Sequence, residues 1–493
     1  MFTISRGGIL SRRADGKPRS TSKSRRRFVM RIATPFCGLI FLVNGRAIGE
    51  DREFPVSEET AQQALEQYVA KADDNFGWKV RRNGMIGATA YSELILTSQR
   101  WRGIEWKHQL FILRPSKTLP DNKQALLLIA GSSWKDELEL PPDTDASLPG
   151  EAKQMALLAE AMQTPVAILL QVPKQPMFDG KHEDALISYT FEEFVKTGDT
   201  QWPLLLPMTK SAVRAMDAVQ AHCRDQWKVP VETFTVTGAS KRGWTTWLTG
   251  AVDKRVTAMA PMVIDVLKMQ AHLELQKKSW GTYSEQIADY TEKGLHDLMA
   301  TPAGKILRTI VDPYSYRQKC RQPKLLLIGT NDRYWPLDAL NLYWKDLVGP
   351  KYVLYVPNVG HGLEDTTRVT GSINALHQHA ARGFQLPQLK WSFARDDQKL
   401  TLRLKSDKPP RRVNAWTATS KNRDFRNSKF KSYSMKQVSK SYEYEITVPE
   451  SGHAVLFGEA VYGDLTLPYY FSTNLQIVSR HSASVTLAPS DSD

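Results

Sequence analysis

A serine lies at the tip of a short turn between a β-branched apolar run and a stretch of helical composition. The run F-T-V-T covers residues 234–237, and Ser240 ends the following G-A-S turn. Strand, tight turn and helix in this order are typical of a nucleophile elbow, where small neighbours let the backbone lift the serine hydroxyl above a sheet. The pattern departs from G-x-S-x-G, because Arg242 takes the place of the second glycine and Gly243 follows it. A serine helix cap would give a similar local sequence.

A serine nucleophile needs a base to accept its proton and an acid to orient that base, in the chain order Ser, Asp, His for this kind of elbow. Asp332 follows the apolar run at 324–330, and His361 follows the apolar run at 352–357. The carboxyl ends of neighbouring parallel strands meet at one edge of a sheet. We therefore predict a catalytic triad of Ser240, Asp332 and His361.

Asp265 is the alternative acid. It follows the run T-A-M-A-P-M-V-I at 257–264, which is the next predicted strand after the elbow helix. Asp332 is the better candidate, because its N-D turn comes directly after a buried apolar strand.

The oxyanion of a tetrahedral intermediate needs hydrogen-bond donors. The backbone N–H of Lys241 is predicted to supply one, and Ser132 or Ser133, in the A-G-S-S-W loop at 130–134, the other. The side chains of Lys241 and Arg242 have two interpretations. They attract an anionic group of the substrate, or they point to solvent from the first turn of the helix.

The segments around these residues alternate between buried strands and helices. Short, unbroken apolar runs are typical of strands covered on both faces. This alternation predicts an α/β-hydrolase-type, mostly parallel sheet in a domain spanning 50–385. Predicted buried strands are 125–131, 166–172, 324–330 and 352–357; predicted helices are 57–75, 151–162, 209–223 and 338–347; antiparallel edge strands are predicted at 91–97 and 106–113.

Two insertions and a change of pattern mark the remaining organisation. The insertions cover 173–207 and about 265–323, and the second is predicted to form a helical cap. Residues 386–493 contain short alternating strands separated by turns, which predicts a separate β-sandwich. A basic run at 421–440 is either a solvated face or a contact for an acidic partner.

The N-terminal 49 residues have the composition of an export signal. They hold eleven Lys or Arg and one Asp, a net +10 that leaves +4 of the +14 for the rest of the chain. A basic start precedes the apolar run at 32–43, which is too short to span a bilayer. Arg25 and Arg26 resemble a twin-arginine signal. We predict a periplasmic or secreted protein without a membrane span in its mature part, and no nucleic-acid partner.

Cysteine and histidine spacing gives no indication of a metal site. Cys37 lies in the leader, and Cys223 and Cys320 remain as a disulfide or as two free buried thiols. No HExxH or paired CxxC motif occurs in the sequence, so neither a metal nor another cofactor is predicted.

Three motifs together resemble the PhoPQ-activated pathogenicity-related protein family: V-T-G-A-S-K-R-G-W-T-T-W-L, G-T-N-D-R-Y-W-P-L-D and V-P-N-V-G-H-G-L. The stretch A-W-T-A-T-S-K-N-R-D-F-R extends the resemblance into the β-rich tail. It implies an α/β-hydrolase relative with Ser240 as nucleophile, Asp332 as acid and His361 as base. The G-x-S-x-x-G elbow is also similar to that of glucuronoyl esterases, which differ in the position of the acid.

The sequence thus predicts an exported serine hydrolase that cleaves an ester or amide through an acyl-enzyme. Its expected substrate is a small molecule, a sugar ester or a short peptide. The alternative is a catalytically silent α/β-hydrolase-like binding or signalling protein, in which Arg242 blocks Ser240.

Overall fold

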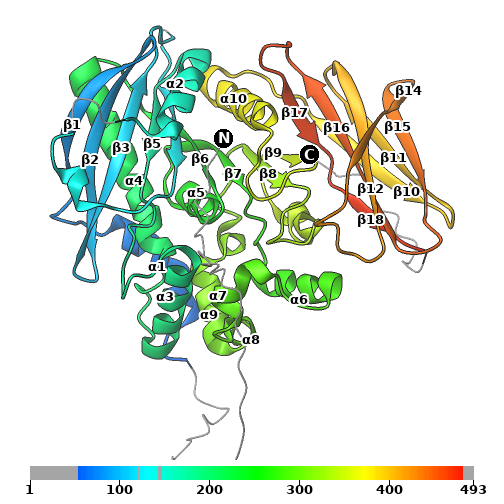
Figure 1. Cartoon of the computed structure of the whole chain (residues 1–493), viewed down its shortest axis with the longest axis horizontal. Coiled ribbons are helices and arrows are strands. Elements are labelled where there is room, and N and C mark those ends of the chain that lie inside the picture. Colours follow the sequence, from blue (N-terminus) through cyan, green and yellow to red (C-terminus); the bar gives the residue numbers. More distant parts are fainter. Residues whose placement is uncertain (1–53, 120, 143–146, 481–493) are drawn as a thin grey trace, which may run out of the picture. The chain divides into compact units, whose positions relative to one another are not determined.

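The computed structural model describes residues 54–119, 121–142 and 147–480, which belong to one compact unit. The predicted export signal lies outside the described residues. Within these residues the main sheet has 14 strands, in the order β1-β2-β3-β5-β4-β6-β7-β8-β9-β17-β16-β12-β13, with β18 beside β16 (Figure 1).

The parallel centre of this sheet consists of β5, β4, β6, β7, β8 and β9 in that order. The antiparallel strands β1, β2 and β3 lie at its edge. All predicted strands are present, and β1 is an additional one. The bounds are β1 Gly77–Ile86, β2 Thr89–Trp101, β3 Ile104–Arg114, β4 Gln124–Ile129, β5 Val166–Leu169, β6 Thr233–Ala239, β7 Val256–Met262, β8 Lys324–Gly329 and β9 Lys351–Val356.

Helices cover both faces of the parallel strands. Leu127 of β4 packs in the cluster that contains α1, α4 and α5, whereas its neighbours Leu126 and Leu128 pack with α2 and α10. Side chains alternate between the faces of a strand, so continuous apolar runs are required here. The predicted α/β-hydrolase-type fold is confirmed. The bounds are α1 Glu58–Ala70, α2 Gly150–Met162, α4 Leu205–His222, α5 Lys241–Val252 and α10 Thr366–Arg382.

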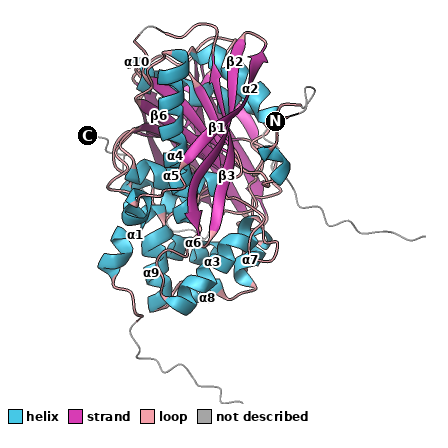
Figure 2. Ribbon diagram, turned by 90° about the vertical axis from the view of Figure 1, so that its left-hand side faces the viewer, coloured by secondary structure: helices cyan, strands magenta, loops and turns pink. Residues whose placement is uncertain are grey.

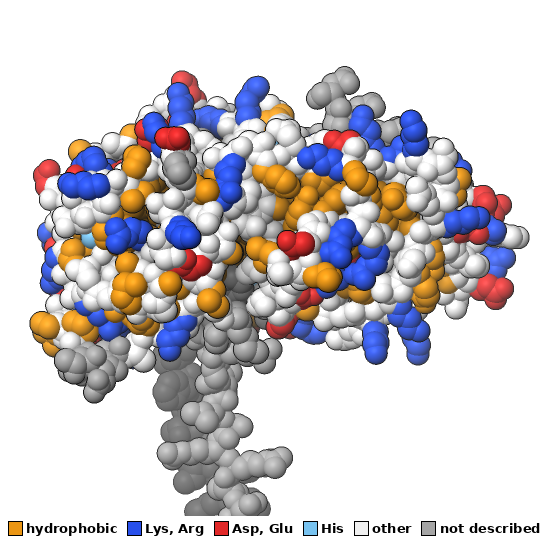
Figure 3. All heavy atoms as spheres, turned by 90° about the horizontal axis from the view of Figure 1, so that it is seen from above, with side chains coloured by type: hydrophobic (Ala, Val, Ile, Leu, Met, Phe, Trp, Pro, Cys, Tyr) orange, Lys and Arg blue, Asp and Glu red, His pale blue; other side chains and the backbone are white. Residues whose placement is uncertain are grey.

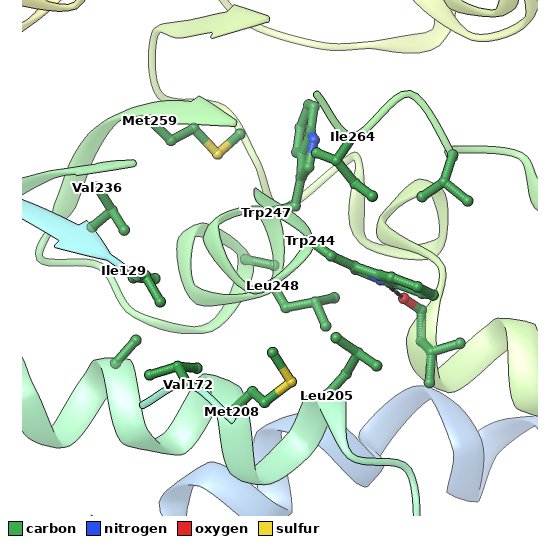
Figure 4. Packing of buried hydrophobic residues seen from close by; sticks show 14 of the residues in the cluster. Ile129, Val172, Leu205, Met208, Val236, Trp244, Trp247, Leu248, Met259 and Ile264 are labelled. Carbon is green, nitrogen blue, oxygen red and sulfur yellow. Dashed lines mark hydrogen bonds between the residues drawn. The ribbon is translucent and has the colours of Figure 1, made fainter. Parts of the chain in front are cut away.

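Helix α5, which follows Ser240, is buried along almost its whole length. Trp244, Trp247 and Leu248 extend from it into the apolar cluster, which includes Val236 of β6 and Met208 of α4 (Figure 4). The indole N–H of Trp244 donates to the carbonyl of Val311, 2.6 Å away. The large side chains of α5 therefore anchor the elbow in the hydrophobic core.

The two insertions are helical. Helix α3 lies in the first, and the second holds α6, α7, α8 and α9; α3, α7, α8 and α9 lie next to one another (Figure 2). The predicted cap of helices over 265–323 is thus present. The bounds are α3 Glu183–Thr197, α6 Met269–Trp280, η3 Glu285–Ile287, α7 Ala288–Thr291, α8 Leu295–Leu298, α9 Pro302–Val311 and η4 Pro313–Tyr316; other short turns are η1 Asp136–Glu139 and η2 Cys223–Trp227.

The predicted helix at 338–347 is wrong. Two 3₁₀ turns, η5 (Ala339–Leu342) and η6 (Trp344–Asp346), occupy this segment. Side chains of this segment hydrogen-bond to two distant parts of the chain. Asn341 donates to the carbonyl of Leu475, and the Tyr343 hydroxyl donates to Asp265. These tertiary contacts override the local preference for a regular helix.

The predicted C-terminal strands are also present, and they form two sheets. One is separate and antiparallel, in the order β10-β11-β15-β14. The other continues the main sheet, because Ser472 of β17 pairs with Val353 of β9. The sequence did not indicate this connection, and the boundary at 385/386 stays a prediction. The bounds are β10 Leu389–Arg395, β11 Lys399–Ser406, β12 Arg412–Ser420, β13 Lys431–Ser434, β14 Lys436–Val438, β15 Ser441–Thr447, β16 His453–Tyr462, β17 Tyr469–Ser472 and β18 Gln476–Val478.

The loop after β12, residues 421–430, is hydrogen-bonded to the segments that follow β8 and β9. The side-chain amide of Asn331 donates to the carbonyls of Phe425, Arg426 and Ser428 at 3.3, 3.2 and 2.8 Å. Asn358 exchanges two hydrogen bonds with the backbone of Phe430. Part of the basic run at 421–440 is therefore a structural contact to the hydrolase sheet.

The other sequence predictions concern the cysteines and the surface. Cys223 and Cys320 are free and buried, and burial raises the pKa of each thiol to about 12. Basic and acidic side chains are interspersed with apolar ones on the face in Figure 3. None of the helices in the described ranges is long and apolar enough to cross a membrane.

The contact of loop 421–430 predicts a stability effect. Asn331→Ala removes the donors to three carbonyls, and we expect a loss of roughly 1–2 kcal/mol in the free energy of unfolding, measured by urea denaturation. Lys429→Ala, at an exposed side chain of the same loop, is the control and should change it by less than about 0.5 kcal/mol. Equal effects of the two substitutions would show that the loop contact contributes nothing.

Candidate active site

Ser240 is held in a strained backbone conformation between β6 and α5. Its φ is 59° and its ψ is −127°, a region that non-glycine residues rarely occupy. The conformation is fixed from both sides, because the Ser240 N–H donates to the carbonyl of Met262 and the Ser240 carbonyl accepts from Trp244 N. A strained serine at a strand-to-helix turn is the geometry of a nucleophile elbow.

The two glycines of this elbow are required by close packing. A Cβ atom at Gly238 would lie 2.8 Å from the carbonyl oxygen of Arg242. A Cβ atom at Gly243 would lie 2.8 Å from the carbonyl oxygen of Met262, on β7. Position 242 carries a full side chain, so the elbow needs its second glycine at position 243. The G-x-S-x-x-G spacing therefore fits this elbow.

Asp332 and His361 are brought together at the ends of β8 and β9. The distance from His361 Nδ1 to Asp332 Oδ2 is 2.7 Å, and Asp332 Oδ1 accepts from the N–H of Tyr334 at 2.9 Å. Asp332 is buried and His361 is half-buried. The carboxylate thus holds the proton on Nδ1 and leaves Nε2 as the acceptor.

Ser240 and His361 are not joined by a hydrogen bond in the described part of the chain, where Nε2 of His361 has no partner. The ring of Tyr334 stacks on the imidazole at a centroid distance of 4.2 Å. Tyr334 lines the same cavity as Ser240. The structure therefore brings Asp332 and His361 into direct contact and places Ser240 on the wall of a cavity that Tyr334, the neighbour of His361, also lines.

Asp265 occupies a different environment. It is buried, and its Oδ1 accepts from the Tyr343 hydroxyl at 2.7 Å. Burial raises the pKa of this carboxyl to about 7. It has no hydrogen bond to His361 among the described residues, so the geometry favours Asp332 over Asp265 as the partner of the imidazole.

The side chains of Lys241 and Arg242 follow neither of the two sequence interpretations. They are only 7% and 8% exposed, and both bind Glu183 at the start of α3. Arg242 makes two hydrogen bonds to Glu183, at 2.7 and 2.8 Å, and Lys241 Nζ also lies 3.3 Å from Asp184. Burial opposes ionisation of Glu183, but the two cations hold its pKa well below the usual range. Ser240 lines the cavity beside it, and Arg242 is not among the side chains that line this cavity.

The loop predicted to supply the second oxyanion donor rests on Arg242. Gly131 lies so close to the guanidinium that a Cβ atom at this position would overlap it. Ser132 is exposed and Ser133 is half-buried. Their role, like that of the Lys241 N–H, stays a prediction, while the position of the loop at the end of β4 agrees with it.

A cavity that is partly open to solvent connects Ser240 with the cap, and its empty space, including the solvent at its mouth, is about 750 Å³. Its walls are mainly apolar and come from α3, α5, α6, α7, α8 and the segments after β7 and β8. Contributing side chains include Trp244, Ile264, Met269, Leu273, Met299 and Trp335. The described residues contain no cluster of three His, Cys, Asp or Glu side chains that could bind a metal ion.

Similarity to known proteins assigns the chain to a family. Residues 65–426 match the family model of the PhoPQ-activated pathogenicity-related protein, which covers most of the chain. The chain belongs to this family. A curated relative, autocrine proliferation repressor protein A from Dictyostelium discoideum, is 30% identical over 393 residues, covering 73% of this chain and 76% of that protein.

Among solved structures, the chain is similar to two acetyl xylan esterases. The esterase from Paenibacillus sp. R4 has 14% identity and a TM-score of 0.45, covering 65% of this chain and 96% of that one. The esterase from Thermoanaerobacterium sp. has 13% identity and a TM-score of 0.42, covering 64% and 94%. A glucuronoyl esterase from Solibacter usitatus has 13% identity and a TM-score of 0.33, covering 56% and 75%.

Three residues near the site were missed by sequence reasoning: Glu183, Tyr334 and His272, an imidazole on the cavity wall. Glu183 lies in an insertion, 57 positions before Ser240, so nothing in the local pattern connects the two. Tyr334 was within the quoted G-T-N-D-R-Y-W-P motif, and its place two residues after Asp332 was the available signal.

The ion cluster predicts a pH-dependent stability difference. Glu183→Gln leaves two buried cations without their shared carboxylate. We expect it to lower the free energy of unfolding at pH 7 by roughly 3 kcal/mol, the lower end for a broken buried pair because Glu183 is partly exposed. Because folding lowers the pKa of Glu183, its contribution is complete above the ordinary value of 4.5 and decreases as the pH falls.

Urea denaturation between pH 3 and pH 7 measures the difference in the free energy of unfolding between the wild type and Glu183→Gln. Carboxylates titrate over roughly this range. Glu193→Gln, which breaks an exposed pair with Lys196 on the same helix, is the control and should cost less than about 1 kcal/mol. A difference that is small at pH 7, or that grows toward low pH, would contradict this role of Glu183.

Proposed function

We propose that this protein is an exported serine hydrolase that cleaves an ester or amide bond through an acyl-enzyme, with Ser240 as nucleophile, His361 as base and Asp332 as acid. The observation that carries the proposal is the strained backbone of Ser240, a residue that lines the cavity. The hydrogen-bonded pair of Asp332 and His361 supports it. The basic and apolar leader at 1–49 supports export.

In the proposed reaction, His361 Nε2 accepts the proton of Ser240 Oγ as this oxygen attacks the carbonyl carbon. Asp332 keeps the imidazole oriented and stabilises its positive charge. The Lys241 N–H and the loop at 130–134 donate to the oxyanion. Collapse of the intermediate breaks the bond to the leaving group, which takes the proton from His361, and water then releases the acid by the same steps.

The missing hydrogen bond between Ser240 and His361 is compatible with this proposal. Catalytic hydrogen bonds in ligand-free enzymes are often long and shorten when substrate binds. The stacked ring of Tyr334 would have to adjust as the substrate enters.

The second candidate is a hydrolase-like binding or signalling protein without turnover. Two observations favour it: His361 Nε2 has no partner in the described residues, and the Dictyostelium relative is named a repressor of proliferation. Chemical reactivity of Ser240 separates the two functions.

A fluorophosphonate probe tests the proposal. We expect covalent labelling of the wild type, because the probe reacts with activated serines, and no labelling of Ser240→Ala. Ser315→Ala, at an exposed serine that does not line the cavity, serves as the control and should be labelled like the wild type. The same probe tests export. When cells that produce the full chain are fractionated, we expect the labelled protein in the periplasm or the medium. Folded wild-type protein that stays unlabelled would contradict the enzymatic proposal.

Two further variants identify the acid. Asp332→Asn keeps the shape of the side chain but loses the charge that orients His361, and we expect the rate of labelling to fall roughly 1,000-fold or more. Asp265→Asn should stay within about threefold of the wild type, as expected for a residue outside the reacting group. The rates are compared by stopped labelling at fixed probe concentration. The opposite order would assign the acid to Asp265.

A further inference from the structure

The cavity next to Ser240 has charged groups on its wall, but their charges compensate each other. Asp184 and Lys241 line it, 3.3 Å apart, and the Tyr290 hydroxyl donates to the other oxygen of Asp184 at 3.0 Å. Glu183 and Arg242 complete a cluster of two carboxylates and two cations. A substrate in the cavity therefore meets no uncompensated charge from this cluster.

His272 on α6 is different, because it is a buried, uncharged polar side chain with an unpartnered ring nitrogen among the described residues. It is 2% exposed and lines the cavity. Its Nε2 is enclosed by protein atoms and makes no hydrogen bond in the described residues, so a ligand group reaches this nitrogen when the ring turns toward the cavity. Its ring meets Trp335 edge-on, at a centroid distance of 5.2 Å. Burial lowers the pKa of His272 to about 3, so the imidazole is neutral at pH 7 and offers one donor and one acceptor.

An unpartnered polar atom is costly inside an apolar wall, and a ligand group that binds it removes this cost. Most other lining side chains are apolar, among them Ile264, Met269, Leu273 and Trp335. The lining also contains Gln276, which is hydrogen-bonded within the protein, and His296, whose Nδ1 has no partner in the described residues. The cavity thus combines a large apolar surface with a small number of polar atoms, as is usual for sites that bind small molecules.

We propose that this cavity binds an uncharged, mainly apolar part of the substrate that carries one hydroxyl or carbonyl group, and that this group hydrogen-bonds to His272. The inference rests on the proposed hydrolase function and narrows its substrate class. It makes His272 a specificity-determining residue, and it argues against carboxylates and amines as the group that enters the cavity, because an unpaired charge is unfavourable in apolar surroundings.

Two matched ester series test the proposal on the purified, full-length mature protein. Ethyl phenylpropanoates carry the aromatic ring on the acyl side, and phenylpropyl acetates carry it on the alcohol side. In each series the ring is unsubstituted, hydroxylated, carboxylated or aminomethylated, and kcat/KM is measured from acid release. In the series whose ring enters the cavity, we expect hydroxylated esters to exceed the unsubstituted ester by about 3- to 10-fold, the effect of one neutral hydrogen bond. Charged esters should fall by more than roughly 100-fold.

Substitution of His272 distinguishes a hydrogen bond from simple packing. His272→Phe keeps an aromatic ring beside Trp335 but removes both polar atoms, so we expect loss of the preference for hydroxylated esters with little change for the unsubstituted ester. His272→Gln keeps a donor and an acceptor and should retain part of the preference, which protects the test if the phenylalanine variant does not fold. His379→Phe, on α10 away from the cavity, is the control, and thermal unfolding checks all variants.

The outcomes separate this inference from the proposed function. If Ser240 is labelled by the fluorophosphonate but charged esters react as well as the unsubstituted ester in both series, only the inference is overturned. The same holds if His272→Phe keeps the full hydroxyl preference. Absence of labelling and of hydrolysis would overturn both.

Discussion

Two cations are buried in the first turn of the helix that follows Ser240, and the site depends on how their charges are compensated. Removing an ammonium and a guanidinium from water is unfavourable unless each is paired. Glu183 binds both, and it comes from α3 in the first insertion. Arg242 also supports the loop at Gly131 and donates to the carbonyl of Val172. One carboxylate therefore connects the elbow, the loop after β4 and the wall of the cavity.

The C-terminal strands have a similar role on the other side of the site. Loop 421–430 binds Asn331, next to Asp332, and Asn358, three residues before His361. The buried carboxylate of Glu459 on β16 pairs with Arg368 on α10 at 3.0 Å, which links the same strands to the helical layer. The β-rich part of the chain thus holds the segments that carry Asp332 and His361, and the family match includes the loop that does so as far as residue 426.

Much of the fold follows from local patterns. The unbroken apolar runs at 125–131 and 352–357 predicted buried parallel strands, because only strands covered on both faces need such runs. The order of Ser240, Asp332 and His361 predicted a triad, and the contact between the last two is observed. Long-range pairing was not accessible: the bridge from Ser472 to Val353 and the ion pair with Glu183 join segments far apart in the chain. At 338–347, tertiary hydrogen bonds replaced the expected helix by 3₁₀ turns.

The central claim is that Ser240 forms a covalent bond with an acyl group during turnover. Rapid acid quenching of the protein with an activated ester, followed by intact-mass measurement and peptide mapping, tests it most directly. We expect a mass increase equal to the acyl group, located on the peptide that contains Ser240 and formed within the first turnover. Release of the acid without any adduct, or an adduct confined to another residue, would contradict it.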